Sequence, residues 1–509
     1  MGLSIAVACF IRAAPVDAAA ACEDLAKISL PNTTITLAKA VPAGAFTPPQ
    51  GAAPAGGGRG QGAGFSDLPA FCQVQATLRP SADSDIKVEV WLPVATSWNG
   101  KLQGFGNPGL GGGVGVNPVV LAGGARRGYA SVGTNSGHEG DSTYAIGHPE
   151  KVKDWGWRAY HEMIVTAKAL IKVHYDKPLV RSVMAQVGGE GMMGLSAAQR
   201  FPEDYDFINS TNVITGFSRG TVWQLWVWMA THDTEGSALP MEKLSVLHQA
   251  VLDACDASDG LEDGLVGQPE HCKFDPGVVQ CKGADAENCL TAPQVAAARK
   301  LYSGPVNPRT KEQIVSPLYP GGELTWGGLA GAAEPFRFAV GWFKGLVFQD
   351  PTWDYRTRPV NFDADVAASD NVVDGNSLDP DLRKFFGKRG KLLLVNGWAD
   401  TTTPPRAGID YYKRVVAKVG EKLARDSMRL FVVPGMGHTP GTTGRENFNF
   451  EGLGVIEQWA DTGQAPEVLI VDHYKDGMLV GKRLACQYPM AATYRGSGNT
   501  EDPASYLCK

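Results

Sequence analysis

The chain has 509 residues, of which 43% are hydrophobic and 20% are charged, and its formal net charge is −6. These values fit an ordinary soluble globular protein with two or three domains. Its basic residues form no dense patch, which argues against a nucleic-acid-binding function.

The N-terminus has the layout of an export signal. An apolar run over residues 3–11 is followed by small residues and an A-x-A-like cleavage site at 16–18, although the usual basic start is missing. We predict a signal peptide over residues 1–18. A lipoprotein signal ending at Cys22 is the rival interpretation. Because of this predicted signal, we expect a secreted or periplasmic protein. Later stretches do not reach the roughly 18 uninterrupted apolar residues of a membrane span, so we expect no membrane span.

The cysteine count supports export. Of nine cysteines, Cys9 lies in the predicted signal, and an even set of eight in an exported protein predicts disulfides. Sequence alone leaves the pairing open, and nearest neighbours are the simplest choice: Cys22–Cys72, Cys255–Cys272, Cys281–Cys289 and Cys486–Cys508.

Strand and helix patterns alternate along much of the chain after a Gly/Ala/Pro-rich stretch (46–66) that we interpret as a flexible loop. This rhythm predicts an α/β protein with a mostly parallel central sheet and helices on both faces. The expected strands are 86–93, 101–106, 128–136, 182–188, 389–400 and 428–438, and the expected helices are 157–175, 190–201, 404–420 and 452–463.

Residues 215–375 break this rhythm with four cysteines, many aromatic residues and several turns. We predict an inserted lid domain there, and a catalytic domain formed by residues 19–214 and 376–509. The aromatic residues either fill the core of the lid or, for two or three of them, line a pocket for an aromatic substrate: Trp223, Trp226, Trp228, Trp326, Trp342, Phe343, Phe348 and Trp353.

An acid and a histidine follow two successive late strands. Asp400 comes after the strand that contains LLLV, and His438 comes after the strand that contains LFVV. Ligands gather at the carboxyl ends of strands in open α/β sheets, and this chain order is that of the acid and histidine of a hydrolase triad. Asp400 would orient the imidazole and stabilise its cation, while His438 would move protons.

Several segments in one order resemble the tannase/feruloyl esterase family over nearly all of the mature chain: LPAFCQVQATLRP, WNGKLQGFGN, RRGYASVGTNSGH, AAQRFPEDYDFI, LDACDASDGLEDGLV and PGMGH. The resemblance implies an exported α/β-hydrolase fold with a large lid and activity on esters of aromatic carboxylic acids. The family includes tannases, feruloyl esterases and mono(2-hydroxyethyl) terephthalate hydrolase.

The nucleophile elbow departs from the family pattern, which reads G-C-S-x-G-G-x-x-G-L ahead of A-Q-R. In QVGGEGMMGLSAAQR (186–200), Gly188 falls on the catalytic Ser and Val187 on the neighbouring Cys. The family bridges that Cys to one directly after the catalytic His, where this chain has Thr439. The nucleophile and both bridge partners are therefore absent together.

The remaining elbow residues leave two alternatives open. Glu190 either sits at a helix start, where the helix dipole favours a carboxylate, or faces His438 as a nucleophile or base. The resemblance implies an oxyanion donor after an early strand, where Pro108 lacks an N–H; Pro108 either removes a donor or merely stiffens the loop. Gly109 and Gly189 remain as candidate oxyanion donors.

The stretch DASDGLEDGLV is either a solvated acidic turn or a Ca²⁺ loop, since it spaces three carboxylates and two turn glycines closely enough for oxygen ligation. The resemblance implies structural Ca²⁺, with carboxylates from Asp256, Asp259 and Asp263 and backbone carbonyls from Leu261 and Leu265.

Three functions remain. The first is hydrolysis of aromatic (phenolic) esters or related acyl substrates without the usual Ser. The second is a lyase or isomerase reaction that uses His438, Asp400 and Glu190. The third is non-catalytic capture of an aromatic ligand. Retention of both Asp400 and His438 favours an enzyme over a binding protein.

Overall fold

The computed structural model describes residues 20–48, 64–106, 110, 116–372, 379–439 and 446–509, without the side chains of residues 189, 190 and 446. The predicted signal peptide lies outside these residues, as do Pro108 and Gly109.

Within the described ranges, nine strands form one central sheet in the order β1-β2-β3-β5-β4-β6-β7-β8-β9. The first three strands pair antiparallel, β3 pairs antiparallel with β5, and the strands from β5 to β9 are parallel. The predicted mostly parallel sheet is confirmed. The strands are β1 (Thr33–Val41), β2 (Phe71–Leu78), β3 (Ile86–Pro93), β4 (Lys101–Phe105), β5 (Ala130–Thr134), β6 (Arg181–Val187), β7 (Phe207–Thr211), β8 (Lys391–Gly397) and β9 (Met428–Val433).

Helices cover both faces of this sheet, because the buried strands are apolar on both sides. On β8, Leu392 and Leu394 pack into a core with helices α3, α4 and α11, while Leu393 and Val395 pack with α13 on the opposite face. The helices of this part of the chain are α1 (Pro118–Arg126), α2 (Pro149–Lys153), α3 (Ala159–Tyr175), α4 (Gly189–Arg200), α11 (Ala407–Val419), α12 (Glu421–Ser427) and α13 (Gly452–Thr462).

The strands and helices predicted from the sequence are observed, with ends that differ by up to five residues, the largest difference being the strand predicted at 428–438, which ends at Val433. The strand predicted at 389–400 begins at Lys391 and ends at Gly397, and the residues after it form the Asp400 loop. The helix predicted at 157–175 begins at Ala159, after a π-helical turn over Asp154–Arg158.

Two smaller sheets complete the C-terminal part. Strands β10 (Glu446–Asn449), β11 (Val468–Lys475) and β12 (Met478–Cys486) pair antiparallel, as do β13 (Ala492–Tyr494) and β14 (Tyr506–Cys508). The four predicted disulfides are all present and join nearest neighbours: Cys22–Cys72, Cys255–Cys272, Cys281–Cys289 and Cys486–Cys508.

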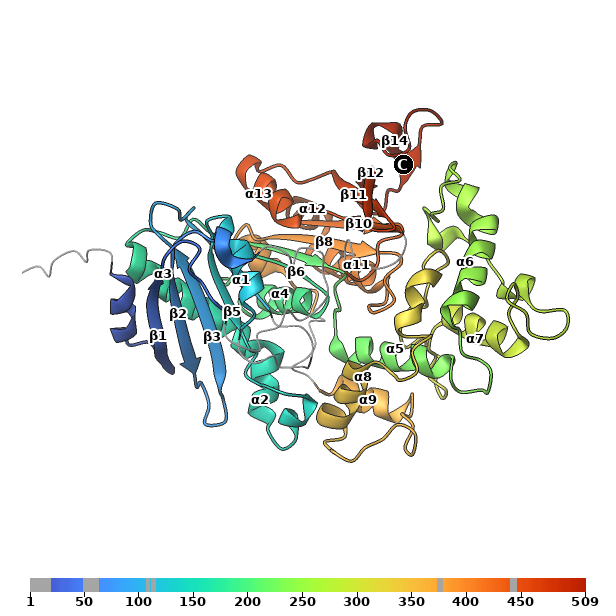
Figure 1. Ribbon diagram of the computed structural model, residues 1–509, viewed down its shortest axis with the longest axis horizontal. Helices are drawn as coiled ribbons and strands as arrows, with labels where there is room; N and C mark the ends of the chain where they lie inside the picture. The colour runs from blue at the N-terminus through green and yellow to red at the C-terminus, as the bar shows by residue number, and fades with distance from the viewer. Residues whose placement is uncertain (1–19, 49–63, 107–109, 111–115, 373–378, 440–445) are drawn as a thin grey trace, which may run out of the picture.

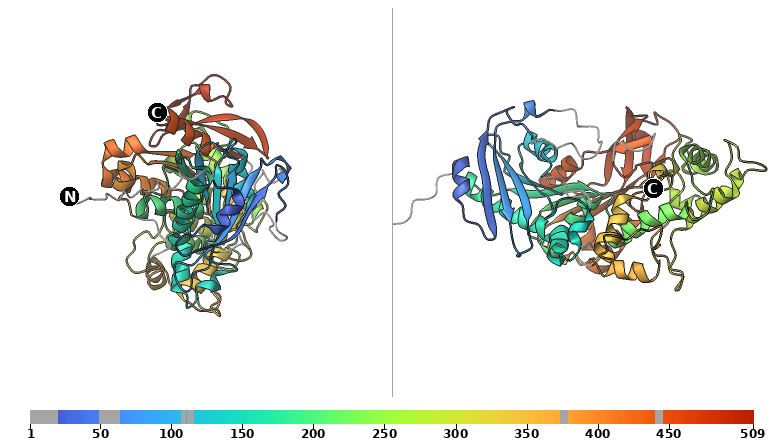
Figure 2. Two further views of the ribbon diagram at one scale, coloured as in Figure 1. Left: turned by 90° about the vertical axis from the view of Figure 1, so that its left-hand side faces the viewer. Right: turned by 60° about the horizontal axis from the view of Figure 1, so that its bottom comes forward.

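A long helical insertion separates β7 from β8 and lies at the opposite end of the molecule from β1–β3 (Figure 1). A second direction of view gives the same arrangement (Figure 2). No helix of the described ranges has both the length and the apolar character to cross a membrane. The helices of the insertion are α5 (Phe217–Ala230), α6 (Met241–Cys255), α7 (Ala292–Ser303), α8 (Arg337–Gly341), α9 (Ala364–Asp370) and α10 (Arg383–Gly387).

Most of the aromatic side chains of the insertion fill cores. Trp223 and Trp326 belong to a core between α5, α6 and α7. Trp342, Phe343 and Trp353 join the main core that extends to the sheet. All five side chains are buried, but only Trp223 and Trp326 fill a core that belongs to the insertion itself.

Candidate active site

Asp400 and His438 meet at the carboxyl end of the sheet. Their loops follow the adjacent parallel strands β8 and β9, and His438 Nδ1 lies 2.9 Å from Asp400 Oδ2. The other carboxylate oxygen accepts hydrogen bonds from the backbone N–H groups of Thr402 and Thr403, at 2.8 and 2.9 Å. The Asp400 side chain is 1% exposed and that of His438 is 25% exposed, so a satisfied buried carboxylate orients a partly accessible imidazole.

Gly188 lies opposite this imidazole, at the turn between β6 and α4. Its backbone has φ +63° and ψ −128°, a conformation that L side chains rarely adopt. A Cβ built on Gly188 would lie 3.0 Å from both Cε1 and Nε2 of His438. A side chain at position 188 would therefore point directly at the histidine, as the nucleophile of a hydrolase triad does.

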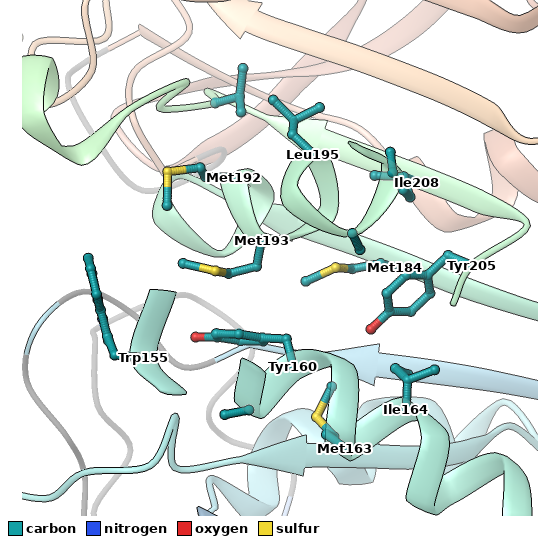
Figure 3. Close-up of a cluster of buried hydrophobic side chains, with 14 of the residues drawn as sticks. Trp155, Tyr160, Met163, Ile164, Met184, Met192, Met193, Leu195, Tyr205 and Ile208 are labelled. Atoms are coloured by element: carbon teal, nitrogen blue, oxygen red, sulfur yellow. The ribbon is translucent and has the colours of Figure 1, made fainter. Parts of the chain in front are cut away.

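Close packing of α4 against the sheet fixes this turn. A Cβ on Gly194 would approach Ile208 Cγ2 to 2.7 Å, so the helix can lie this near to β7 only with glycine at that position. Towards α3, Met193 of α4 faces Tyr160 within the same buried core (Figure 3). The elbow is thus held between a strand and a buried helix.

Comparison with known proteins identifies the family. Residues 72–509 match the model of the family described as tannase and feruloyl esterase. The chain belongs to the tannase and feruloyl esterase family. An uncharacterized esterase of Xanthomonas campestris pv. campestris is 34% identical, over 96% of this chain and 91% of its own length. A probable feruloyl esterase B of Aspergillus clavatus is 29% identical, over 95% of this chain and 94% of its own length.

Solved structures agree with this assignment. The crystal structure of feruloyl esterase B from Aspergillus oryzae aligns with a TM-score of 0.85 and 25% identity, covering 96% of this chain and 99% of that one. The tannin acyl hydrolase from Aspergillus niger shares the fold, with a TM-score of 0.76 at 18% identity over 94% of this chain and 92% of that one. The fold is that of the α/β-hydrolase esterases.

The other residues predicted at the elbow are Gly189, Glu190, Val187 and Thr439, and their proposed roles stay predictions. Helix α4 begins at Gly189, so the N–H of Gly189 is one of those without an intrahelical acceptor and stays a candidate oxyanion donor. Glu190 lies in the first turn of α4, and because its side chain is not described, its catalytic role stays a hypothesis. Val187 and Thr439, which stand at the family's bridge positions, line one cavity of about 420 Å³.

Sequence reasoning missed the residues that hold the Asp400 loop. From α5 of the insertion, Trp223 Nε1 donates to Thr401 O at 2.9 Å and Gln224 Nε2 donates to Thr402 O at 2.9 Å. These bonds end on backbone carbonyls, which sequence patterns do not distinguish. The insertion therefore supports the acid of the site as well as covering this end of the sheet.

In the predicted Ca²⁺ loop, the acidic side chains accept hydrogen bonds from backbone N–H groups of the same loop. Asp256 accepts the N–H groups of Asp263 and Gly264, at 3.2 and 2.8 Å, and Asp259 accepts that of Leu261 at 3.1 Å. Asp263 accepts the N–H of Leu265 at 3.2 Å and pairs with an arginine of β12, Arg483, at 2.7 Å.

Four of the five predicted ligands border one small cavity of about 50 Å³: Asp259, Leu261, Asp263 and Leu265. Burial, together with repulsion from Asp263 and Asp256, raises the pKa of Asp259 to about 6. Among the described residues, no three His, Cys, Asp or Glu side chains are grouped as a metal site. The donors are oxygens from carboxylates and carbonyls, and this chemistry fits Ca²⁺.

Proposed function

We propose that the protein hydrolyses esters of aromatic carboxylic acids with a water molecule in place of the serine nucleophile. The observation that carries the proposal is the Gly188 geometry, where a Cβ would lie 3.0 Å from His438 Nε2. Because glycine has no side chain, the position of a serine hydroxyl is left to water beside a histidine that Asp400 already orients.

His438 would act as general base and then as general acid. In the first step Nε2 takes a proton from the water as its oxygen bonds to the ester carbonyl carbon, which gives a tetrahedral oxyanion. In the second step the bond to the alcohol oxygen breaks and that oxygen takes the proton from Nε2. Asp400 stabilises the intervening imidazolium, and the N–H of Gly189 would donate to the oxyanion.

The substrate class comes from the relatives. Homologues named feruloyl esterase B match 95% of this chain, and the aligned feruloyl esterase B structure covers 96% of it. We therefore propose a small phenolic ester as substrate. The four disulfides support a secreted or periplasmic location, since disulfides persist in oxidising compartments.

We also propose structural Ca²⁺ in the loop at 256–265. The small cavity bordered by Asp259 and Asp263 and by the residues of the two predicted carbonyl ligands supports it. The Cys255–Cys272 disulfide closes the loop from both sides. The ion would brace the fold and take no part in the reaction.

Pre-steady-state kinetics on p-nitrophenyl and methyl esters of phenolic acids test the proposed reaction. The wild type is expected to turn over without a burst of product and without an acyl adduct in the intact-protein mass, and His438→Gln is expected to abolish turnover. A stoichiometric burst or an acylated protein contradicts direct attack by water, and absence of ester turnover contradicts the function itself.

The other two hypotheses gain no specific support. The family match and the named relatives are esterases, and the described residues offer no observation that favours a lyase, an isomerase or a ligand-binding protein. Ester hydrolysis is the function that the dyad geometry supports best.

A further inference from the structure

Asn212 lies directly after β7, between the two loops of the dyad. It is completely buried, and its backbone has φ +49°, in the left-handed region. Its N–H donates to Val395 O of the neighbouring strand β8 at 2.7 Å. This conformation carries the side chain across the carboxyl edge of the sheet towards both loops.

The side-chain amide of Asn212 joins both loops. Nδ2 donates to the backbone carbonyls of Gly437 and His438, at 2.8 and 2.7 Å, and Oδ1 accepts from the N–H of Gly397 at 2.7 Å. The backbone carbonyl of Asn212 accepts from the hydroxyl of Thr403 at 3.3 Å, and this hydroxyl lies 3.3 Å from His438 Nδ1.

These bonds reach the peptide of His438 itself. The acid loop and the histidine loop are also joined by Trp398 N–H to Val433 O at 3.0 Å and by Ala399 N–H to Met436 O at 3.1 Å. Both of those bonds end at least two residues before His438, so they fix the course of the loop and not the peptide that carries the imidazole.

Asparagine meets the three demands of this position together. The amide supplies two donor hydrogens and an acceptor, and asparagine is one of the few residues with a Cβ that readily adopts left-handed φ. An aspartate would keep the shape and the acceptor, but it would turn an oxygen towards two carbonyl oxygens. A glycine would keep the backbone conformation and lose every side-chain bond.

We propose that Asn212 is a positioning residue that holds the imidazole of His438 between Asp400 and position 188. The inference rests on the proposed function insofar as the orientation of His438 serves catalysis. Loss of the amide would let the His438 peptide rotate, which lengthens the Nδ1 to Oδ2 bond and misplaces Nε2. A misplacement of about 1 Å in a reacting group can lower a rate about 100-fold.

The test compares Asn212→Asp with Asn209→Asp. Asn209 is a matched control, since it lies on β7, is 4% exposed, and its side-chain amide donates to Thr211 Oγ1 at 3.1 Å and not to a backbone carbonyl of the histidine loop. The full-length protein is labelled with ¹⁵N-histidine, and the downfield Nδ1 proton of His438 is assigned by its loss in His438→Gln. The other eight histidines report whether each variant is folded.

Asn212→Asp is expected to lose or shift this signal and to lower kcat about 100-fold with KM unchanged, while Asn209→Asp keeps both. If Asn212→Asp does not fold, Asn212→Gly replaces it, and the same changes in the Nδ1 proton signal and in kcat are expected. A wild-type signal and kcat in both Asn212 variants would overturn the proposal, as would a change in KM alone. If the wild type shows no ester turnover but the signal depends on Asn212, positioning stands and the proposed function fails.

Discussion

Replacing Gly188 by serine should install a covalent nucleophile. The structure predicts two penalties. The conformation at φ +63° and ψ −128° strains any residue with a Cβ by about 1–3 kcal/mol. The new Cβ also lies 3.0 Å from the imidazole, so His438 must shift by a few tenths of an ångström. We expect a melting temperature a few degrees lower and a new acyl-enzyme route, because the hydroxyl would lie within reach of the base.

Gly188→Ala is the matched control, since it adds the same Cβ and the same strain without a hydroxyl. Only Gly188→Ser should be labelled at that position by a fluorophosphonate probe and show a burst with a p-nitrophenyl ester. The double variant with His438→Gln should lose both signals. If Gly188→Ser is folded but resists the probe as the alanine variant does, position 188 does not face a competent base and the geometric reasoning is wrong.

Three further results are expected. Asp400→Asn should lower ester turnover by about 10³–10⁴-fold, because the imidazole loses its orienting anion; an unchanged kcat would remove Asp400 from the mechanism. Chelation by EGTA should lower the melting temperature, since a ligand present at 100 times its Kd contributes about 2.7 kcal/mol, and Asp259→Asn should remove this sensitivity. Gly194→Ala should destabilise the protein by about 1–3 kcal/mol in urea. Gly123→Ala on α1, where no atom lies within 4 Å of the added Cβ, should be neutral or stabilising.

The sequence predicted those parts of the fold that are marked by a pattern of neighbouring residues, such as an apolar run that ends in a polar loop. Strand β8 is a run of apolar residues bounded by a polar loop, and its observed range differs from the predicted one mainly because Trp398 and Ala399 already belong to that loop. The order of strands placed Asp400 and His438 side by side, since adjacent parallel strands end at one edge. Nearest-neighbour pairing of the cysteines is also confirmed, with sequence separations of 50, 17, 8 and 22 residues.

Long-range hydrogen bonds were beyond sequence reasoning. Trp223 and Asn212 support the dyad through bonds to backbone carbonyls that are 178 and 226 residues away in the sequence, and backbone groups are the same at every position. Asn212 did carry one signal, a polar residue directly after a buried strand. Its left-handed backbone, which sends the amide towards both loops, is visible only once the strands are paired.

The geometry of the Asp400–His438 dyad supports the proposed activation of water at position 188. A buried carboxylate such as Asp400 is tolerated only where hydrogen bonds replace its hydration, and two N–H groups and the imidazole supply them here. A purely structural role would need only these bonds to the Asp400 carboxylate. The ring also presents its Cε1 and Nε2 atoms to position 188, and general-base catalysis at that position needs this arrangement. The combination of an oriented imidazole with a glycine at position 188 is what the proposed reaction requires.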